Sequence, residues 1–480
     1  MNARAPIVVA LVASATALLA TKAAAQSPIP PAAVSGLPLR SIGPALMGGR
    51  IADLAVHPRD RHTWYVAAGS GGVWKTTNAG VTFSPIFDAQ SSYSIGALAI
   101  DPTNPEVVWV GTGENVSGRH VGWGDGVYRS RDGGRSWQRM GLPQSQHVAK
   151  ILVDPRDGNT VLVAAEGPLW SAGGDRGVYR TTDGGATWTA VLTIDENTGV
   201  TDLEFDPSSP DVVYAASYQR RRHVWGLLAG GAGSGIHKST DNGRTWRRVS
   251  AGLPVGDKGK IGLAVTAADP RLVYATIEAN EEERGFYRSR DRGESWEKRN
   301  GYISGGTGPH YYQEIEASPV NADLVYQMDV FLQVTRDGGA TFTTLESGHD
   351  KHSDNHAMWI DPTDPDFFII GDDGGIAVTY DRGGTYDFIN TMPIGQFYAV
   401  AHDMSKPYRV CGGLQDNGSW CGPSRTNSRF GIQNEDWFNV GGGDGFYTAI
   451  DPENPNVIYS ESQGGNISRL DVSSGDRMAL

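Results

Sequence analysis

The stretch Ser130-Arg131-Asp132-Gly133-Gly134-Arg135-Ser136-Trp137 decides the fold, because variants of it recur along the chain. Each copy has Ser or Thr, any residue, Asp, any residue, Gly, any residue, Ser or Thr, and then an aromatic residue. The aspartates of six copies, at intervals of 44 to 58 residues, are Asp132, Asp183, Asp241, Asp291, Asp337 and Asp381. An earlier copy has Asn78 instead, and weaker copies lie around Asp416 and Asp471. Such a period predicts an architecture of similar stacked units.

Each copy lies within a longer unit of about four short apolar segments. The unit around 95–141 begins with an apolar stretch ending in Asp101-Pro102, continues through 107–110 and Gly126-Val127-Tyr128-Arg129, and closes after the copy. Four short strands per unit predict an all-β fold, a β-propeller of four-stranded blades. Seven clear copies and two weak ones allow seven to ten blades: one ring, or one ring plus a partial second.

The repeated aspartates have a structural explanation. An Asp side chain accepts hydrogen bonds from the amides of a tight turn, and Gly adopts the positive φ angles that such turns require. The aromatic residue then packs on the neighbouring unit. A residue that recurs once per blade is not a unique site, so we interpret these aspartates as turn-forming residues.

The N-terminal sequence predicts export. Arg4 precedes an apolar run at 7–20, and Ala23-Ala24-Ala25 supplies small residues for cleavage near Ala25. We expect a signal peptide at 1–25, a linker at 26–40, propeller blades at 41–390, and degenerate blades at 391–480 that close the ring or start a second propeller. The mature protein is then secreted or periplasmic, with no transmembrane segment. An uncleaved membrane anchor is the alternative.

The net charge bears on the class of partner, and the cysteine content bears on the presence of a disulfide. The net charge of −13 argues against a nucleic-acid partner, which favours a basic face. The two cysteines, Cys411 and Cys421, flank a Gly-rich turn, so we expect a disulfide across a hairpin in an oxidising compartment, with two free thiols as the alternative.

The repeated motif resembles the Asp-box (BNR) repeat of sialidases, of sortilin-type propellers and of the two-propeller xyloglucanases of glycoside hydrolase family 74. Stretches at 42–51, 111–115, 123–126, 371–375 and 413–418 resemble exported bacterial proteins with a sortilin-like N-terminal propeller. The resemblance implies a propeller. It implies less about activity, because propellers have many unrelated functions.

The sequence departs from both enzyme families at specific positions. Family 74 enzymes have a catalytic Asp in an Arg-Thr-Asp-x-Gly-Gly run of the first repeat, whereas the matching stretch at 67–72 has Gly69 in that place. Sialidases have an early Arg-Ile-Pro motif, whereas Arg50-Ile51-Ala52 lacks the proline. The resemblance therefore supports the fold more than the chemistry.

Loops between the second and third strands, and between successive blades, lie on one face of a propeller and form its ligand funnel. Asp372, Asp373 and Asp354 fall in these loops and are candidate catalytic carboxylates. Further candidates for ligand binding are Arg50, Glu114, Arg119, His120, His310, Tyr311, Tyr312, His349, Asp350, His352, His356, Gln415 and Asp416.

Three functions fit these residues. The first is a propeller that binds a peptide, a protein or a polysaccharide in its funnel. The alternative is a glycoside hydrolase with funnel carboxylates as acid and base. A metal-dependent hydrolase ranks third: we expect no cofactor, and a divalent metal near His349 and His352 in this polar loop is the alternative.

Overall fold

The computed structural model describes residues 40–46, 48–305, 308–312, 314–346 and 350–480, together with Ala33 and Gly36. The predicted signal peptide and most of the predicted linker lie outside these residues, as does His349. Residues 1–41 and 42–480 are separate units, and all the described strands belong to the second. In the described part of the chain, no helix is long and apolar enough to span a membrane.

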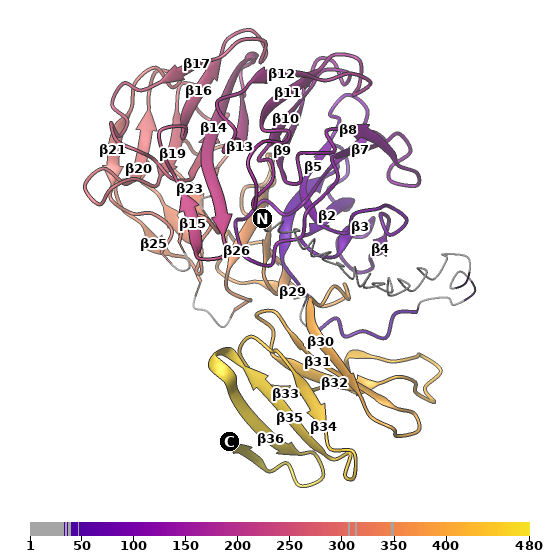
Figure 1. Ribbon diagram of the computed structural model, residues 1–480. Helices are drawn as coiled ribbons and strands as arrows, with labels where there is room; N and C mark the ends of the chain where they lie inside the picture. Colours follow the sequence, from indigo (N-terminus) through magenta and orange to yellow (C-terminus); the bar gives the residue numbers. More distant parts are fainter. Residues whose placement is uncertain are drawn as a thin grey trace, which may run out of the picture. The chain divides into compact units, whose positions relative to one another are not determined.

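The described strands form nine antiparallel sheets, numbered here in chain order, each made of strands consecutive in sequence (Figure 1). Sheet 1 contains β1 (Ile51–Val56), β2 (Trp64–Ala68), β3 (Gly72–Thr76) and β4 (Ser84–Pro85). Sheet 2 contains β5 (Ile95–Ile100), β6 (Val108–Thr112), β7 (Val127–Ser130) and β8 (Gln138–Gly141). Sheet 3 contains β9 (Val148–Val153), β10 (Val161–Ala165), β11 (Gly177–Thr181) and β12 (Thr189–Leu192). Sheet 4 contains β13 (Thr198–Asp206), β14 (Ser209–His223), β15 (Gly226–Ala229), β16 (Gly235–Ser239) and β17 (Arg247–Val249).

The remaining sheets follow the same order of strands. Sheet 5 contains β18 (Ile261–Val265), β19 (Val273–Ile277), β20 (Gly285–Ser289) and β21 (Glu297–Asn300). Sheet 6 contains β22 (Ile315–Ala317), β23 (Val325–Gln327), β24 (Gln333–Thr335) and β25 (Thr343–Thr344). Sheet 7 contains β26 (Asn355–Ile360), β27 (Phe368–Asp372), β28 (Gly375–Thr379) and β29 (Asp387–Ile389). Sheet 8 contains β30 (Phe397–His402), β31 (Arg409–Leu414), β32 (Ser419–Pro423) and β33 (Phe438–Gly441), and sheet 9 contains β34 (Thr448–Ile450), β35 (Val457–Ser462), β36 (Asn466–Asp471) and β37 (Arg477–Ala479). Short 3₁₀ turns occur at Asn434–Asp436 and Gln463–Gly465.

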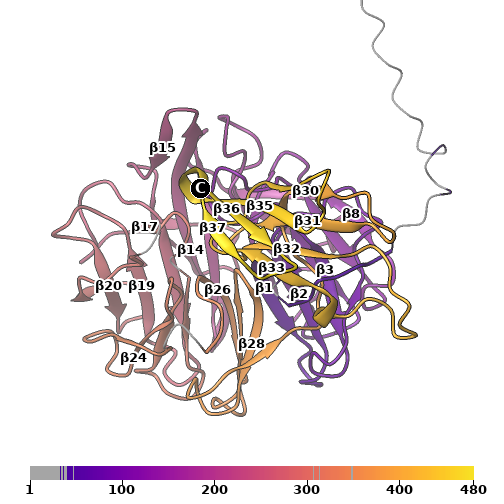
Figure 2. The ribbon, with the colours of Figure 1, turned by 90° about the horizontal axis from the view of Figure 1, so that it is seen from below.

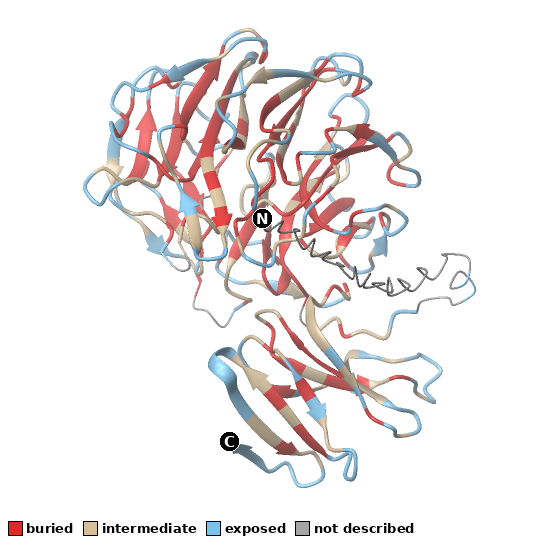
Figure 3. Ribbon diagram, viewed as in Figure 1, coloured by how far each residue is buried: buried red, intermediate tan, exposed pale blue. Residues whose placement is uncertain are grey.

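The first seven sheets form a ring, so the chain has the multi-bladed β-propeller fold that the repeats predict. The inner strands of sheets 1 to 6 contact one another in succession, and an apolar core shared by Tyr326 and Ile370 joins sheet 6 to sheet 7. The contact of β1 with β26 brings sheet 7 against sheet 1. One apolar core joins Ile51 and Leu54 of sheet 1 to Ala357 and Ile369 of sheet 7. Because each sheet is made of its own consecutive strands, the ring closes through side-chain packing rather than through exchange of a strand. Figure 3 shows that the middle strands of the sheets are largely buried and the outer ones are exposed.

Sheets 8 and 9 pack on each other through a separate apolar core, and they lie side by side in Figures 1 and 2. Cys411 and Cys421 occupy directly opposed positions on β31 and β32 and form a disulfide in that core. The segment between sheets 7 and 8 returns to the ring, because Met392 and Ile394 are buried in the core between sheets 1 and 7.

The repeated turns connect the third and fourth strands of a sheet, and they also contact the preceding sheet. In the turn of sheet 2, the carboxylate of Asp132 accepts hydrogen bonds from the Ser136 amide at 2.9 Å and from its hydroxyl at 2.6 Å. Gly133 has a φ of 67° there. Lys75 of sheet 1 donates to the Gly133 carbonyl at 2.9 Å. Hydrogen bonds from Arg180 to Asn242 and from Lys238 to Arg292 repeat this link between later sheets.

One feature differs from the sequence-based expectation. Asp416, expected in a weak copy of the repeated turn, lies between β31 and β32, the second and third strands of sheet 8, and its φ is 59°.

The basic run Arg220 to His223 extends β14 and pairs with β15 as a hairpin. Arg220 and Arg222 are buried, and both bond to Ser117, so they do not form an open basic patch.

Candidate functional site

A loop of sheet 2 lies across the axis of the ring. Residues 113–126 connect β6 to β7, and the Ser117 amide donates to the His310 carbonyl, just before sheet 6, at 3.1 Å. Arg222 of sheet 4 donates to the Ser117 carbonyl at 3.1 Å. Since sheets 2, 4 and 6 are not neighbours in the ring, this loop covers the axial opening where the sequence places a ligand funnel.

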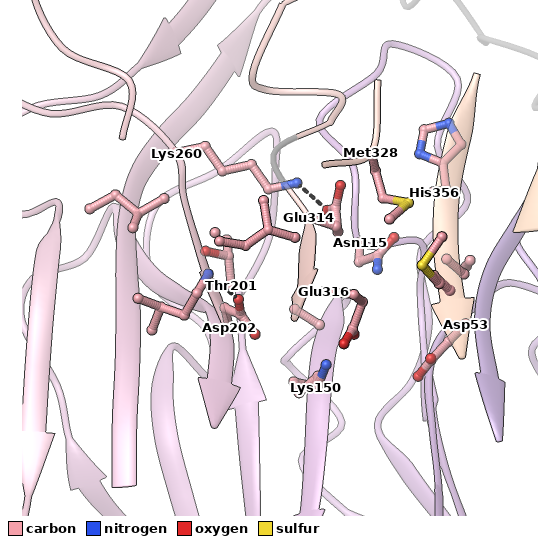
Figure 4. A pocket seen from close by; sticks show the side chains of 18 of the residues that line it. Asp53, Asn115, Lys150, Thr201, Asp202, Lys260, Glu314, Glu316, Met328 and His356 are labelled. Carbon is pink, nitrogen blue, oxygen red and sulfur yellow. Dashed lines mark hydrogen bonds and ion pairs between the residues drawn. The ribbon is translucent and has the colours of Figure 1, made fainter. Parts of the chain in front are cut away.

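The axial cavity beneath this loop is small and acidic (Figure 4). It has a volume of about 60 Å³, enough for a few water molecules. Asp53, Asp202, Glu204 and Glu316 surround Lys150, whose ammonium lies 3.4 Å from the Glu204 carboxylate. Burial raises the pKa of Glu204 to about 8 and that of Glu316 to about 7. In the described residues, no group of three or more His, Cys, Asp and Glu side chains is arranged to hold a metal ion.

Arg50, directly before β1, joins three sheets at the same face as the covering loop. Its guanidinium binds Glu114 of sheet 2 at 2.8 Å, and it binds both carboxylate oxygens of Asp373 of sheet 7 at 2.8 and 3.1 Å. All three side chains are buried. A buried charge must be paired to be stable, and the two hydrogen bonds to Asp373 also fix the orientation of the guanidinium. The ring of Tyr311 lies 4.6 Å from the guanidinium.

Asp416 brings sheet 8 into this cluster. Its carboxyl group shares a hydrogen bond with that of Asp373, and its amide donates to the Asp444 carboxylate at 2.6 Å. Burial, reinforced by the negative charges of Asp373 and Asp444, raises the pKa of Asp416 to about 8. Burial opposes the ionisation of Asp373, but Arg50, His356 and the hydrogen bond from Asp416 together outweigh it and hold the pKa of Asp373 below its usual range. One proton is therefore held between these carboxyl groups at neutral pH.

The other candidate carboxylates are engaged by the protein itself. Asp372 accepts a hydrogen bond from the Gly374 amide at 2.9 Å, and the buried Lys351 lies 3.6 Å from its other oxygen. Burial raises the pKa of Asp372 to about 6. Asp354 accepts hydrogen bonds from the hydroxyls of Tyr312 and Ser353.

His352 and His356, two of the candidate ligand-binding histidines, lie in different environments. His356 is buried, stacks on Tyr312, and has a ring nitrogen 3.2 Å from Asp373. His352 is half-buried, with a ring nitrogen 3.3 Å from the Asp416 carbonyl oxygen. Asp350 is exposed.

Solvent reaches the cluster along one edge. Tyr311, Gln415 and Asp416 are partly exposed, and the Gln415 amide donates to the Tyr311 hydroxyl at 3.3 Å. His310 is also partly exposed, and Arg119 and His120 are exposed.

Three residues that the sequence did not single out complete this edge. The Tyr398 ring centre lies 5.7 Å from that of His120 and stacks on Phe446 at 5.2 Å. Asp444 is the third. The Gly-rich run 441–445 around Asp444 is the one sequence signal that could have drawn attention to it.

Comparison with known proteins agrees with this fold. The family model described as "Sortilin, neurotensin receptor 3" matches residues 125–254. A xyloglucanase of Paenibacillus sp is 27% identical over 239 residues, 44% of this chain and 22% of that protein. The Hypocrea jecorina xyloglucanase is 28% identical over 222 residues, 41% of this chain and 25% of that protein. The chain thus spans about a quarter of the length of these curated relatives.

Among solved structures, the family 74 xyloglucanase from Xanthomonas campestris superposes with a TM-score of 0.60. The alignment covers 92% of this chain and 74% of that one at 16% identity, a level that supports the fold alone. The chain is therefore an all-β propeller similar to sortilin-type domains over residues 125–254, and similar to family 74 xyloglucanases in fold.

Proposed function

We propose that the chain is an exported propeller that binds a peptide, protein or polysaccharide ligand at the edge of the Arg50 cluster. One observation carries this proposal: separate loops of sheets 1, 2, 7 and 8 converge on a single polar cluster, and Tyr311, Gln415 and Asp416 leave it partly open to solvent. Irregular loops that meet in this way on a rigid scaffold are where propellers place binding residues.

The arrangement of the carboxylates favours binding over hydrolysis. Glycoside hydrolysis uses two carboxyl groups that face the scissile bond from opposite sides. Here both oxygens of Asp373 are bound by Arg50, and Asp372 is held by Gly374 and Lys351. Both side chains are also buried, so neither carboxylate is open to a substrate.

The surroundings of Gly69, in the first repeat, also favour binding over hydrolysis. A side chain at Gly69, where family 74 enzymes have a catalytic Asp, would begin 3.1 Å from the Glu114 carboxylate. An aspartate there would repel Glu114, which is already committed to Arg50. The chain thus has a salt bridge in the place of that catalytic group.

Glycoside hydrolysis is the second candidate, because Asp416 has the property of a general acid. Its pKa of about 8 keeps the carboxyl group largely protonated at neutral pH, as an acid that donates to a leaving group requires. In this alternative Asp416 protonates the glycosidic oxygen, and one of Asp372, Asp373 and Asp354 acts as base.

The two functions are separated by assaying residues 26–480 on peptide arrays and on a polysaccharide panel, with and without a chelator. We expect binding that Asp416→Asn weakens and that Asp364→Asn leaves unchanged, because Asp364 lies in the β26–β27 turn on the other face. Hydrolysis of a polysaccharide that is lost in Asp372→Ala would contradict the binding function and support the second candidate.

A further inference from the structure

We propose that the group recognised at this site is a cation, the lysine or arginine side chain of a peptide segment. This inference rests on the proposed binding function and specifies the ligand. It follows from an excess of hydrogen-bond acceptors and from the aromatic rings around them.

The excess of acceptors becomes clear when each carboxyl group of the cluster is matched with a cation. Arg50 is the buried cation of the cluster, and its guanidinium is used by Glu114 and Asp373. Asp416 and Asp444 then lie beside each other without a paired cation among the described residues: the Asp416 backbone amide donates to one Asp444 oxygen, and the Gln463 side chain donates to the other at 3.1 Å. Two adjacent carboxyl groups at a partly exposed edge attract a further positive charge.

A buried amide adds another acceptor at the same turn. Asn417 is 5% exposed, and its amide nitrogen donates to the carbonyls of Asp373 and Gln415. Its side-chain oxygen accepts no hydrogen bond from the described residues. A buried acceptor without a donor costs free energy unless a ligand or water supplies one.

Aromatic rings line the same edge. Tyr398 lies between His120 and Phe446, and the charges of Asp444 and Asp416 both act on its hydroxyl. A cation above a ring face is attracted by the electrons of the ring. The contact of Arg50 with the Tyr311 ring, at 4.6 Å, is an example of this interaction within the site itself.

The proton on Asp416 offsets the negative charge that a ligand cation would otherwise offset. The pKa of Asp416 is raised, first by burial and then by the charges of Asp373 and Asp444. A ligand ammonium or guanidinium would satisfy the same negative charges and displace this proton. The groups that can oppose them with positive charge are Arg50, already paired, and the rings of His352 and His356, which lie 3.3 Å from the Asp416 carbonyl oxygen and 3.2 Å from Asp373.

A peptide fits this site better than an amino sugar. The acceptors lie in a partly buried position, which suits a long flexible side chain whose apolar stem contacts the aromatic rings. The net charge of −13 also favours encounter with a basic partner.

The experiment measures binding of synthetic nonapeptides to residues 26–480 by fluorescence anisotropy. The central residue is Lys, Arg, N-acetyl-lysine, Ser or Glu in an otherwise neutral sequence; a chitosan oligomer and a neutral xyloglucan oligomer complete the set. We expect the Lys and Arg peptides to bind at least tenfold more tightly than the others. Asp416→Asn should remove most of this preference, and Tyr398→Leu should weaken it several-fold, whereas Tyr398→Phe should retain it.

Two variants serve as controls. Asp364→Asn and Tyr380→Leu change the same residue types at exposed positions outside the site and should leave binding unchanged. Folding of each variant is verified by its circular dichroism and melting temperature.

Each outcome has a distinct meaning. Equal binding of the Lys and N-acetyl-lysine peptides, or binding of chitosan in place of the Lys peptide, would overturn the inference and leave the proposed binding function intact. Absence of binding by every probe, with correctly folded protein, would overturn both.

Discussion

The guanidinium of Arg50 binds both carboxylate oxygens of Asp373, and these two residues belong to the first and the last sheet of the ring. The contact therefore contributes both to the closure of the propeller and to the candidate site. The proposed ligand recognition would therefore be coupled to the stability of the ring at this point of the molecule.

Replacement of Arg50 by Met should destabilise the protein strongly. Glu114 and Asp373 would stay buried without their partner, and breaking a buried ion pair in this way costs about 3–5 kcal/mol. Urea unfolding followed by tryptophan fluorescence measures the loss. Arg156→Met is the matched control, because Arg156 is half exposed and pairs with Asp154 and Asp211, so its loss should cost at most about 1 kcal/mol.

The axial carboxyl groups should make the protein less stable as the pH rises from 5 to 8. Glu204 has a pKa of about 8 and Glu316 a pKa of about 7, so the folded state holds protons that the unfolded state has released. Stability is complete below the unfolded pKa and is lost as the pH rises through the folded one, with a slope of at most about 1.4 kcal/mol per pH unit for each extra proton.

Unfolding midpoints in urea between pH 5 and 9 test this dependence. Glu316→Gln should flatten the curve, because a neutral amide no longer releases a proton. Glu282→Gln, a change at an exposed glutamate, should leave the curve unchanged. A midpoint that increased steadily up to pH 8 would show that the axial carboxyl groups ionise freely.

Asp241→Ala should lower stability without affecting ligand binding. The carboxylate accepts hydrogen bonds from the Thr245 amide and hydroxyl at 2.9 and 2.7 Å, and it lies in the turn of sheet 4 between β16 and β17. Loss of these partly exposed bonds should cost about 1 kcal/mol. Binding and thermal unfolding, measured on the same sample, test both parts; a large loss of affinity would give the repeated turns a role in recognition.

Reduction of the disulfide should destabilise sheets 8 and 9 in particular. Cys411 and Cys421 are 10 residues apart, so their link removes about 2–3 kcal/mol of chain entropy from the unfolded state. Hydrogen exchange of a Cys411→Ala/Cys421→Ala variant should show faster exchange in β31 and β32, while strands of the ring such as β10 keep their protection.

The repeats were sufficient to predict the propeller, because every copy reports the same local requirement of a tight turn after a third strand. The sequence also allows the prediction that Arg50, Glu114, Asp373 and Asp416 lie at one face of the ring, where they are found together. The reason is that loops between second and third strands, and between successive blades, lie at the same face of a propeller. The ion pairs between these residues could not be predicted from the sequence, because they join residues up to several hundred positions apart.

Other features of the site had weaker signals. Lys150 interrupts the apolar strand β9, and a charge at such a position indicates an axial partner. Tyr398 lies in a sheet whose repeat is degenerate, so nothing in the local pattern marked it. The covering loop depends on Ser117 bonding to sheets far along the chain, which no local pattern reports.

The ring has a seam between sheets 1 and 7, which are not consecutive in sequence and are joined by the packing of β1 on β26 and by the Arg50–Asp373 contact. Met392 and Ile394 fill this seam on their way to sheet 8. A cationic peptide bound at Asp416, beside the seam, would stabilise the closed ring, so occupancy of the site should slow the opening of the whole ring as well as protect its own loops.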